Sequence, residues 1–258
     1  MDDLSGIREV DGSCEFCKRW GPLTGEHLGS DWLNRAFPEW TIGSHEIGWS
    51  GGRNTVWKSE PKPGVFTFKV VAVCEPCNNG WMSRLESAVI PTLTPMARGE
   101  GNVTLSRPAQ RRLAFWIAKT AMVFTMTEAP MVPTEHYAFL YRRRSRKDRD
   151  LPSDVRVLIS ACPNPQYIFK IQLRPPEKPA SLAQPYAIAM NVGNLLMQIT
   201  FDPGKTLTHL NDRFDPRSLI QIWPIVHDEV KWPPQPPLDR LNYDAFIGVF
   251  LPETQTTG

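Results

Sequence analysis

Four of the five cysteines in the chain form two pairs of the same spacing. Two residues separate Cys14 from Cys17, which gives the pattern C-x-x-C, and Cys74 and Cys77 repeat this pattern. Two such pairs supply four thiolates in the tetrahedral geometry that structural zinc prefers. A thioredoxin-like redox role fits poorly, because it would use one pair without a second. We therefore predict a structural Zn²⁺ bound by these four residues, and expect Cys162 to be a small buried side chain.

A carboxylate and an imidazole follow the first cysteine pair as the neighbours Glu26 and His27. A glutamate can hold a hard divalent ion such as Mg²⁺, and a histidine, with an ordinary pKa of about 6.5, can take a proton from water at neutral pH. The alternative is structural, with Glu26 as a cap and His27 hydrogen-bonded in a loop. We expect these two residues to end a short strand.

An asparagine directly follows the last cysteine. Asn78 lies at the start of a helical pattern that is predicted over Asn79–Val89. Because one zinc ion would tie both cysteine pairs together, the start of this helix should lie close to the strand that carries Glu26 and His27. The amide oxygen of Asn78 could then share Mg²⁺ or Mn²⁺ with Glu26. The alternative role of Asn78 is helix capping, which we assign instead to Asn79.

The order of these residues resembles a known family. The sequence resembles the His-Asn-His (HNH) nucleases of the ββα-metal fold, in particular the phage recombination endonuclease VII group. The shared features are two zinc knuckles, an acidic residue and a histidine between them, and an asparagine after the last cysteine. The resemblance implies that Glu26 and Asn78 bind the catalytic divalent ion and that His27 is the general base in phosphodiester hydrolysis. It covers residues 10–90.

Two departures from the family pattern stand out. An asparagine usually precedes the second knuckle, but Lys69 lies in that stretch here. The segment between His27 and Cys74 is also long, and its glycines suggest an inserted hairpin or loop. His45 or Asn54 in this insertion could replace the missing asparagine.

Several basic residues are candidates for contacts with phosphate groups. These residues are equally typical of a solvated surface. The only dense basic run in the sequence is Arg142–Arg149, and its alternative role is a helix end followed by a loop. Glu86 is a further candidate ligand, although a helix salt bridge with Arg84 or another neighbour is the simpler expectation. The candidate phosphate-binding residues are Arg53, Lys58, Arg84, Arg142, Arg143 and Arg144.

The remaining elements predict an α+β protein with two domains. An N-terminal ββα-metal (treble-clef-like) zinc domain is expected over 1–92, and an α+β domain with helices and a mainly antiparallel sheet over 93–258. Residues 91–105 are predicted to be a proline- and glycine-marked connection. A buried helix should begin near Ser106, a shorter helix should follow over 133–141, and apolar runs with a turn at 191–194 predict the strands.

Composition limits the possible partners. The net charge is only +2, so any nucleic-acid surface must be local. No apolar run is long enough to cross a membrane, and the polar N-terminus does not resemble a secretory signal, so we expect a cytoplasmic protein. The expected partner is DNA, with RNA as an alternative, and a homodimer is possible. Recombination, defence and mobile elements are all compatible settings. The alternative function is a catalytically decayed zinc-knuckle module that binds nucleic acid or protein.

Overall fold

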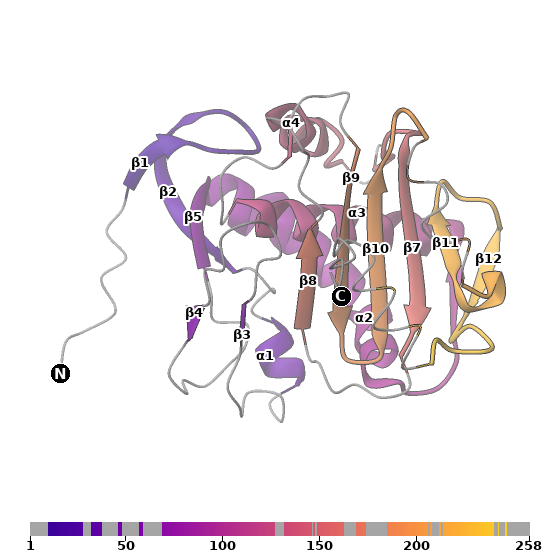
Figure 1. Ribbon diagram of the computed structural model, residues 1–258. Helices are drawn as coiled ribbons and strands as arrows, with labels where there is room; N and C mark the ends of the chain where they lie inside the picture. The colour runs from indigo at the N-terminus through magenta and orange to yellow at the C-terminus, as the bar shows by residue number, and fades with distance from the viewer. Residues whose placement is uncertain are drawn as a thin grey trace, which may run out of the picture.

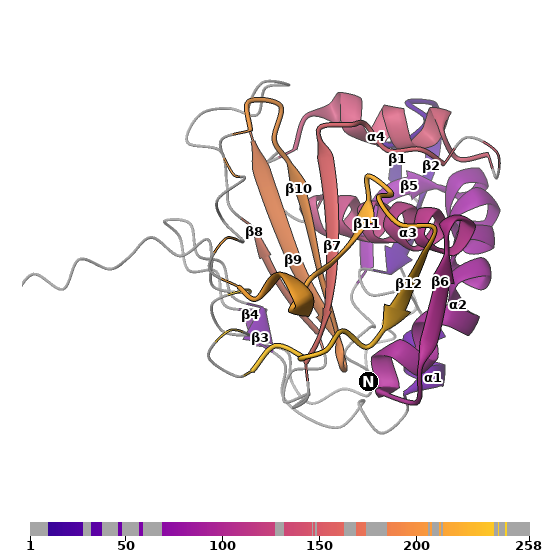
Figure 2. The same ribbon diagram turned by 90° about the vertical axis from the view of Figure 1, so that its right-hand side faces the viewer.

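The computed structural model is an α+β structure in which helices cover one side of an antiparallel sheet (Figure 1). Sheet and helices form two layers when the molecule is turned (Figure 2). The structure describes residues 10–27, 32–37, 46–47, 57–58, 69–126, 132–145, 147, 149–162, 169–173, 185–205, 207, 212, 214–239, 242 and 246.

The N-terminal part is a three-stranded antiparallel sheet in the order β1-β2-β5. Its strands are β1 (Val10–Ser13), β2 (Trp20–His27) and β5 (Lys69–Cys74). The register of β2 and β5 shifts after Thr24, which marks a bulge in the pairing. Along the chain, β2 is followed by the short helix α1 (Trp32–Ala36) and then by two short strands, β3 (Glu46–Ile47) and β4 (Trp57–Lys58), before β5 begins. Strands β3 and β4 form an antiparallel pair.

The second knuckle runs directly into a long helix. It begins as the π-helix η3 (Pro76–Met82) and continues as α2 (Ser83–Arg98). The prediction of an irregular connection from residue 91 is therefore wrong, because α2 contains Pro91 and Pro95. A proline removes the hydrogen bond to the carbonyl four residues earlier, and here those carbonyls belong to the exposed residues Ser87 and Pro91, where water can bind them.

The next elements match the sequence-based expectation. Strand β6 (Val103–Ser106) leads into α3 (Arg107–Thr125), and Ser106 is the residue that precedes the first helical turn. As predicted, α3 is buried nearly all round, because both sheet and helices pack against it. Helix α4 (Thr134–Arg142) follows within one residue of its predicted bounds.

The main sheet has five antiparallel strands in the order β11-β7-β10-β9-β8. Gly193, with a φ of 56°, forms the predicted tight turn between β9 and β10. The short strand β12 pairs with β6 rather than with this sheet. The elements are β7 (Val155–Ala161), β8 (Phe169–Leu173), β9 (Tyr186–Val192), β10 (Leu195–Phe201), the 3-10 turn η5 (Pro216–Ser218), β11 (Ile220–Trp223) and β12 (Glu229–Trp232).

Both faces of the central strands are buried. In β9, Ile188 and Met190 point into the core shared with the helices, whereas Ala187 and Ala189 belong to a smaller cluster on the other face that includes Phe246. This alternation follows from the two-residue period of a strand. The main sheet therefore gives α3 a rigid base on which polar side chains can be held in place.

One continuous core joins the cysteine pairs to the main sheet. It includes Cys14 and Phe16 near the N-terminus and Met197 and Trp232 far along the chain. Helix α2 also continues through residue 92, where the sequence suggests a domain boundary. No helix in the described part of the chain is long and apolar enough to cross a membrane.

Candidate metal centre and adjoining polar site

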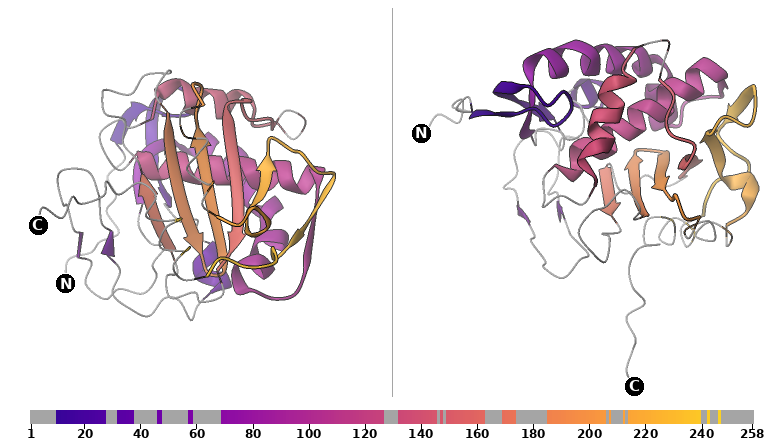
Figure 3. Two further views of the ribbon diagram at one scale, coloured as in Figure 1. Left: turned by 45° about the vertical axis from the view of Figure 1, so that its right-hand side comes forward. Right: turned by 90° about the horizontal axis from the view of Figure 1, so that it is seen from above.

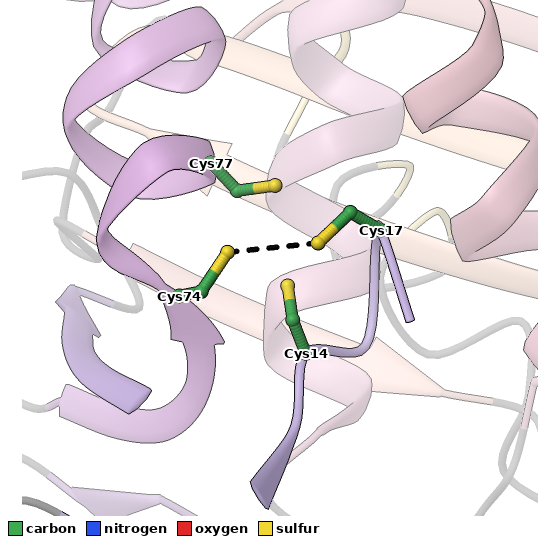
Figure 4. Close-up of side chains that lie close together, drawn as sticks. All are labelled: Cys14, Cys17, Cys74 and Cys77. Atoms are coloured by element: carbon green, nitrogen blue, oxygen red, sulfur yellow. Dashed lines mark hydrogen bonds between the residues drawn. The ribbon is translucent and has the colours of Figure 1, made fainter. Parts of the chain in front are cut away.

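The four paired cysteines lie together, one pair on the turn between β1 and β2 and the other at the junction of β5 and η3 (Figure 4). Their sulfur atoms all lie within 4.8 Å of one another. The Sγ atoms of Cys17 and Cys74 are 3.6 Å apart. Tetrahedral Zn²⁺ with zinc–sulfur bonds of about 2.3 Å separates its ligands by about 3.8 Å. The cluster therefore has the size and donor set of a four-cysteine site that could hold a metal ion such as zinc.

Backbone hydrogen bonds shape the first knuckle. The N–H of Lys18 donates to the carbonyl of Cys14 over 2.8 Å, and Lys18 adopts a φ of 58°, in the left-handed region. The N–H of Glu15 donates to the carbonyl of Ala72 over 3.0 Å, which joins the first knuckle to the strand that carries the second. The knuckles are thus held together by protein contacts as well as by the sulfur atoms.

The surroundings of the sulfur atoms favour a thiolate at Cys14, whereas burial raises the pKa of the Cys74 thiol to about 11. A hydrogen bond with Cys77 lowers the pKa of the Cys14 thiol to about 4, and the same hydrogen bond raises the pKa of Cys77. The buried Nε1 of Trp81 has no hydrogen-bond partner among the described residues, and its N–H acts to lower the pKa of the Cys77 thiol. Such an N–H suits a metal-bound thiolate, because the thiolate accepts hydrogen bonds while it keeps its bond to the metal.

Asn78 connects the new helix to the strand that carries Glu26 and His27. Its Nδ2 donates to Thr24 Oγ1 over 3.1 Å and to the carbonyl of Gly25 over 3.4 Å. These bonds use the amide hydrogens of Asn78, whereas Oδ1 is the atom suited to a hard cation. The predicted division of roles was wrong in one respect: the helix already begins at Pro76, so Asn79 does not cap it but lies 3.5 Å from Glu75 Oε1.

Glu26 does not lie open to solvent but in a buried ionic cluster. The Nζ of Lys119, on α3, lies 3.3 Å from Glu26 Oε1 and 2.6 Å from Glu86 Oε1. The side chains of Lys119, Glu26 and Glu86 are 1%, 6% and 19% exposed, respectively. Glu86 therefore forms a salt bridge, as expected, and its partner is Lys119 on α3.

The electrostatics of this cluster follow from burial and pairing. Burial raises the pKa of Glu26, and the neighbouring ammonium of Lys119 only partly opposes this. Burial acts to lower the pKa of Lys119, but the charges of Glu86 and Glu26 outweigh it, so this pKa is raised. Two carboxylates and one ammonium carry a formal charge of −1, which is a setting that attracts a further cation.

His27 ends β2 next to this cluster. It is half-buried, and its backbone is paired with Lys69 across the sheet. Lys69 is exposed, so the position where an asparagine was expected carries a solvated cation instead. The two candidates for its replacement, His45 and Asn54, lie outside the described residues.

The predicted phosphate-binding residues are spread over different parts of the surface. Arg84 is exposed on α2, while Arg142 and Arg143 are exposed at the end of α4. Arg144 is half-buried, with its guanidinium 3.8 Å from the centre of the Tyr141 ring. Arg53 lies outside the described residues, and for Lys58 the structure describes only its place in β4.

Lys119 was missed by the sequence analysis. The available signal was a single charge inside the otherwise apolar run of α3, which could not reveal the partners. Glu26 is 93 residues away along the chain.

No protein-family model, curated protein or solved structure matches this chain.

Proposed function

We propose that this protein is a metal-dependent endonuclease that hydrolyses phosphodiester bonds in DNA. The observation that carries the proposal is the contact of Asn78 with Thr24 and Gly25, immediately before Glu26 and His27. This contact supports the proposal because the side chain of Asn78 then lies beside the strand that carries a carboxylate and an imidazole, the other residue types of an HNH nuclease site. The ββα-metal assignment of this region is part of the proposal.

Each residue has a distinct task in this reaction. His27 takes a proton from the attacking water through a ring nitrogen. Glu26, through Oε2, and Asn78, through Oδ1, would hold the divalent ion, because Glu26 Oε1 faces Lys119 and Asn78 Nδ2 is already bonded to β2. A bound Mg²⁺ or Mn²⁺ would supply Lewis-acid stabilisation of the phosphate and of the leaving oxygen. The cysteine cluster, with Zn²⁺, would hold β2 and η3 next to each other.

Plasmid cleavage tests this function. Zinc-loaded protein is incubated with supercoiled DNA and Mg²⁺ or Mn²⁺, and the nicked and linear products are measured. The variant His27→Ala should lose about 100-fold or more of the rate, because general-base catalysis contributes about this much. His227→Ala is the matched control, since His227 is exposed and its contact to Gln110 uses only the backbone carbonyl. Equal rates for wild type and His27→Ala would refute the assignment.

A second function is favoured by one observation. Lys119 already places a positive charge against Glu26 and Glu86, as a bound cation would. In a decayed nuclease this ammonium would replace the catalytic ion, and the protein would serve as a zinc-knuckle module that binds nucleic acid or protein.

Metal titration separates the two functions. Binding of Mn²⁺ to zinc-loaded protein is followed by electron paramagnetic resonance. The endonuclease should bind one Mn²⁺ that is lost in Asn78→Ala, because Asn78 would be a direct ligand. Absence of Mn²⁺ binding together with absence of cleavage would favour the binding module.

A further inference from the structure

The first zinc knuckle packs against α4, far from it in sequence. The rings of Phe16 and Tyr137 meet edge to face with centroids 5.8 Å apart. The Nζ of Lys18 lies 5.9 Å from the centre of the Tyr137 ring, and the sulfur of Cys17, followed by the hydroxyl of Tyr141, raises the pKa of the Arg19 guanidinium. The turn between β1 and β2 also lies beside α4 in two views of the ribbon (Figure 1; Figure 3, right).

This contact brings the first knuckle, which carries exposed basic side chains, close to α4, which also ends in exposed basic side chains. Lys18 and Arg19 are exposed on the knuckle, and Arg142 and Arg143 are exposed where α4 ends. Glu15 pairs with Lys18 over 2.7 Å, so Lys18 adds the least net charge. We name this the knuckle–α4 surface, and it consists of Lys18, Arg19, Trp20, Arg142, Arg143 and Arg144.

An aromatic ring stands in the same surface. Trp20 directly follows Arg19, begins β2 and is 77% exposed. Of the large apolar side chains that are exposed in the described part of the chain, Trp20 is the only aromatic one. An exposed indole beside several guanidinium groups is the arrangement that binds unpaired nucleotides, because the cations contact phosphates and the ring stacks on a base. Paired bases in a regular duplex do not offer a free face for this stacking.

We propose that the knuckle–α4 surface binds DNA at unpaired bases, with one base stacked on Trp20 and the backbone phosphates on the arginines. It deepens the proposed function, because it assigns the substrate class of the endonuclease as DNA with single-stranded segments. The surface belongs to the same knuckle that carries Cys14 and Cys17, so DNA bound there lies on the zinc-cluster side of the protein.

Binding is tested without cleavage, by fluorescence anisotropy on zinc-loaded protein with no other divalent ion. The probes are a labelled thymidine single strand, a fully paired blunt-ended DNA duplex whose strands are joined through a non-nucleotide linker, and a uridine single strand. Trp20→Ala should weaken binding of the DNA single strand by roughly tenfold and change duplex binding by less than about twofold, because stacking needs an unpaired base. The double variant Arg142→Ala/Arg143→Ala should weaken both and reduce the salt slope by about 1 to 2.

A double variant with the same charge change controls for non-specific electrostatics. Arg217→Ala/Lys231→Ala also removes two exposed positive charges, near β11 and in β12, on the opposite side of the main sheet from β1 and β2 in Figure 1. It should change affinity by less than about twofold. An equal loss in this control, or an unchanged single-strand affinity in Trp20→Ala, would overturn the proposal. Tighter, Trp20-dependent binding of the uridine strand would overturn the assignment to DNA. Failure of the endonuclease assignment would appear separately, as absence of plasmid cleavage by protein that still binds.

Discussion

The buried ammonium of Lys119 gives the sharpest test of the site's electrostatics. The substitution Lys119→Met keeps an unbranched side chain, one atom shorter, and removes its charge. Glu26, with a side chain only 6% exposed, then loses its counter-ion while Glu86 remains nearby. Breaking a buried ion pair by removing one partner destabilises proteins by about 3–5 kcal/mol. We expect a loss of this size in the free energy of unfolding at pH 7, measured by urea denaturation with zinc present.

The pH dependence identifies the cause of the loss. Burial already raises the pKa of Glu26, and the opposing effect of Lys119 disappears in the variant, so this pKa rises further. Between the unfolded and the folded pKa, the native state then binds a proton that the unfolded chain does not. Stability therefore increases as the pH falls, by up to about 1.4 kcal/mol per pH unit. The loss at pH 5 should be about 2 kcal/mol smaller than the loss at pH 7.

Two further variants complete this test. Glu26→Gln in the Lys119→Met background removes the unpaired charge and should restore most of the stability at pH 7. Lys231→Met, on an exposed lysine, is the control and should change stability by less than about 0.5 kcal/mol. A loss in Lys119→Met that is equal at pH 5 and pH 7 would show that packing, and not charge, is responsible.

Three other predictions concern the metal, a helix end and a histidine. Purified protein should contain one zinc per chain by metal analysis, and Cys74→Ser should lose it and lower Tm by on the order of 10 °C; unchanged Tm without zinc would refute the structural role. Gly99→Ala should lower the free energy of unfolding, measured with denaturant, by about 1–2 kcal/mol, because Gly99 has a φ of 70° and a Cβ would lie 2.6 Å from Asn194 Nδ2. Gly80→Ala is the control and should not lower it, because a Cβ at Gly80 would meet no atom within 4 Å. Burial lowers the pKa of His136, so stability should fall as the pH drops below about 6.5, where the unfolded chain binds the extra proton, and this slope should be smaller in His136→Gln.

Much of the fold follows from local sequence patterns. The apolar runs and the turn at 191–194 predict β9 and β10 nearly to the residue, because a strand buried on both faces leaves few alternatives. The sequence predicts a helix that ends at Val89, because prolines and glycines mark residues 91–105 as a connection, but α2 continues to Arg98. Leu93 and Met96 are fully buried on its inner face, and this packing outweighs two missing hydrogen bonds on the outer face.

The candidate site was predictable only where spacing is specific. Two C-x-x-C pairs indicate a shared metal because few other functions use that pattern. The approach of Asn78 to β2 follows from the predicted shared metal, but its hydrogen bond to Thr24 depends on side-chain geometry that residue types do not reveal. The partnership of Lys119 with Glu26 and Glu86 joins three separate segments, and its stability comes from mutual burial rather than from any local pattern.

Helix α2 is fastened at both ends, which fixes its length. At its start, η3 carries Cys77 of the cysteine cluster. At its other end, the backbone N–H of Asn194, in the turn between β9 and β10, donates to the carbonyl of Ala97 over 2.8 Å. One inserted residue rotates everything beyond it by about 100° and advances it by about 1.5 Å. An insertion or deletion in α2 could therefore satisfy the cysteines or the sheet but not both, so this helix should tolerate substitutions far better than changes in length.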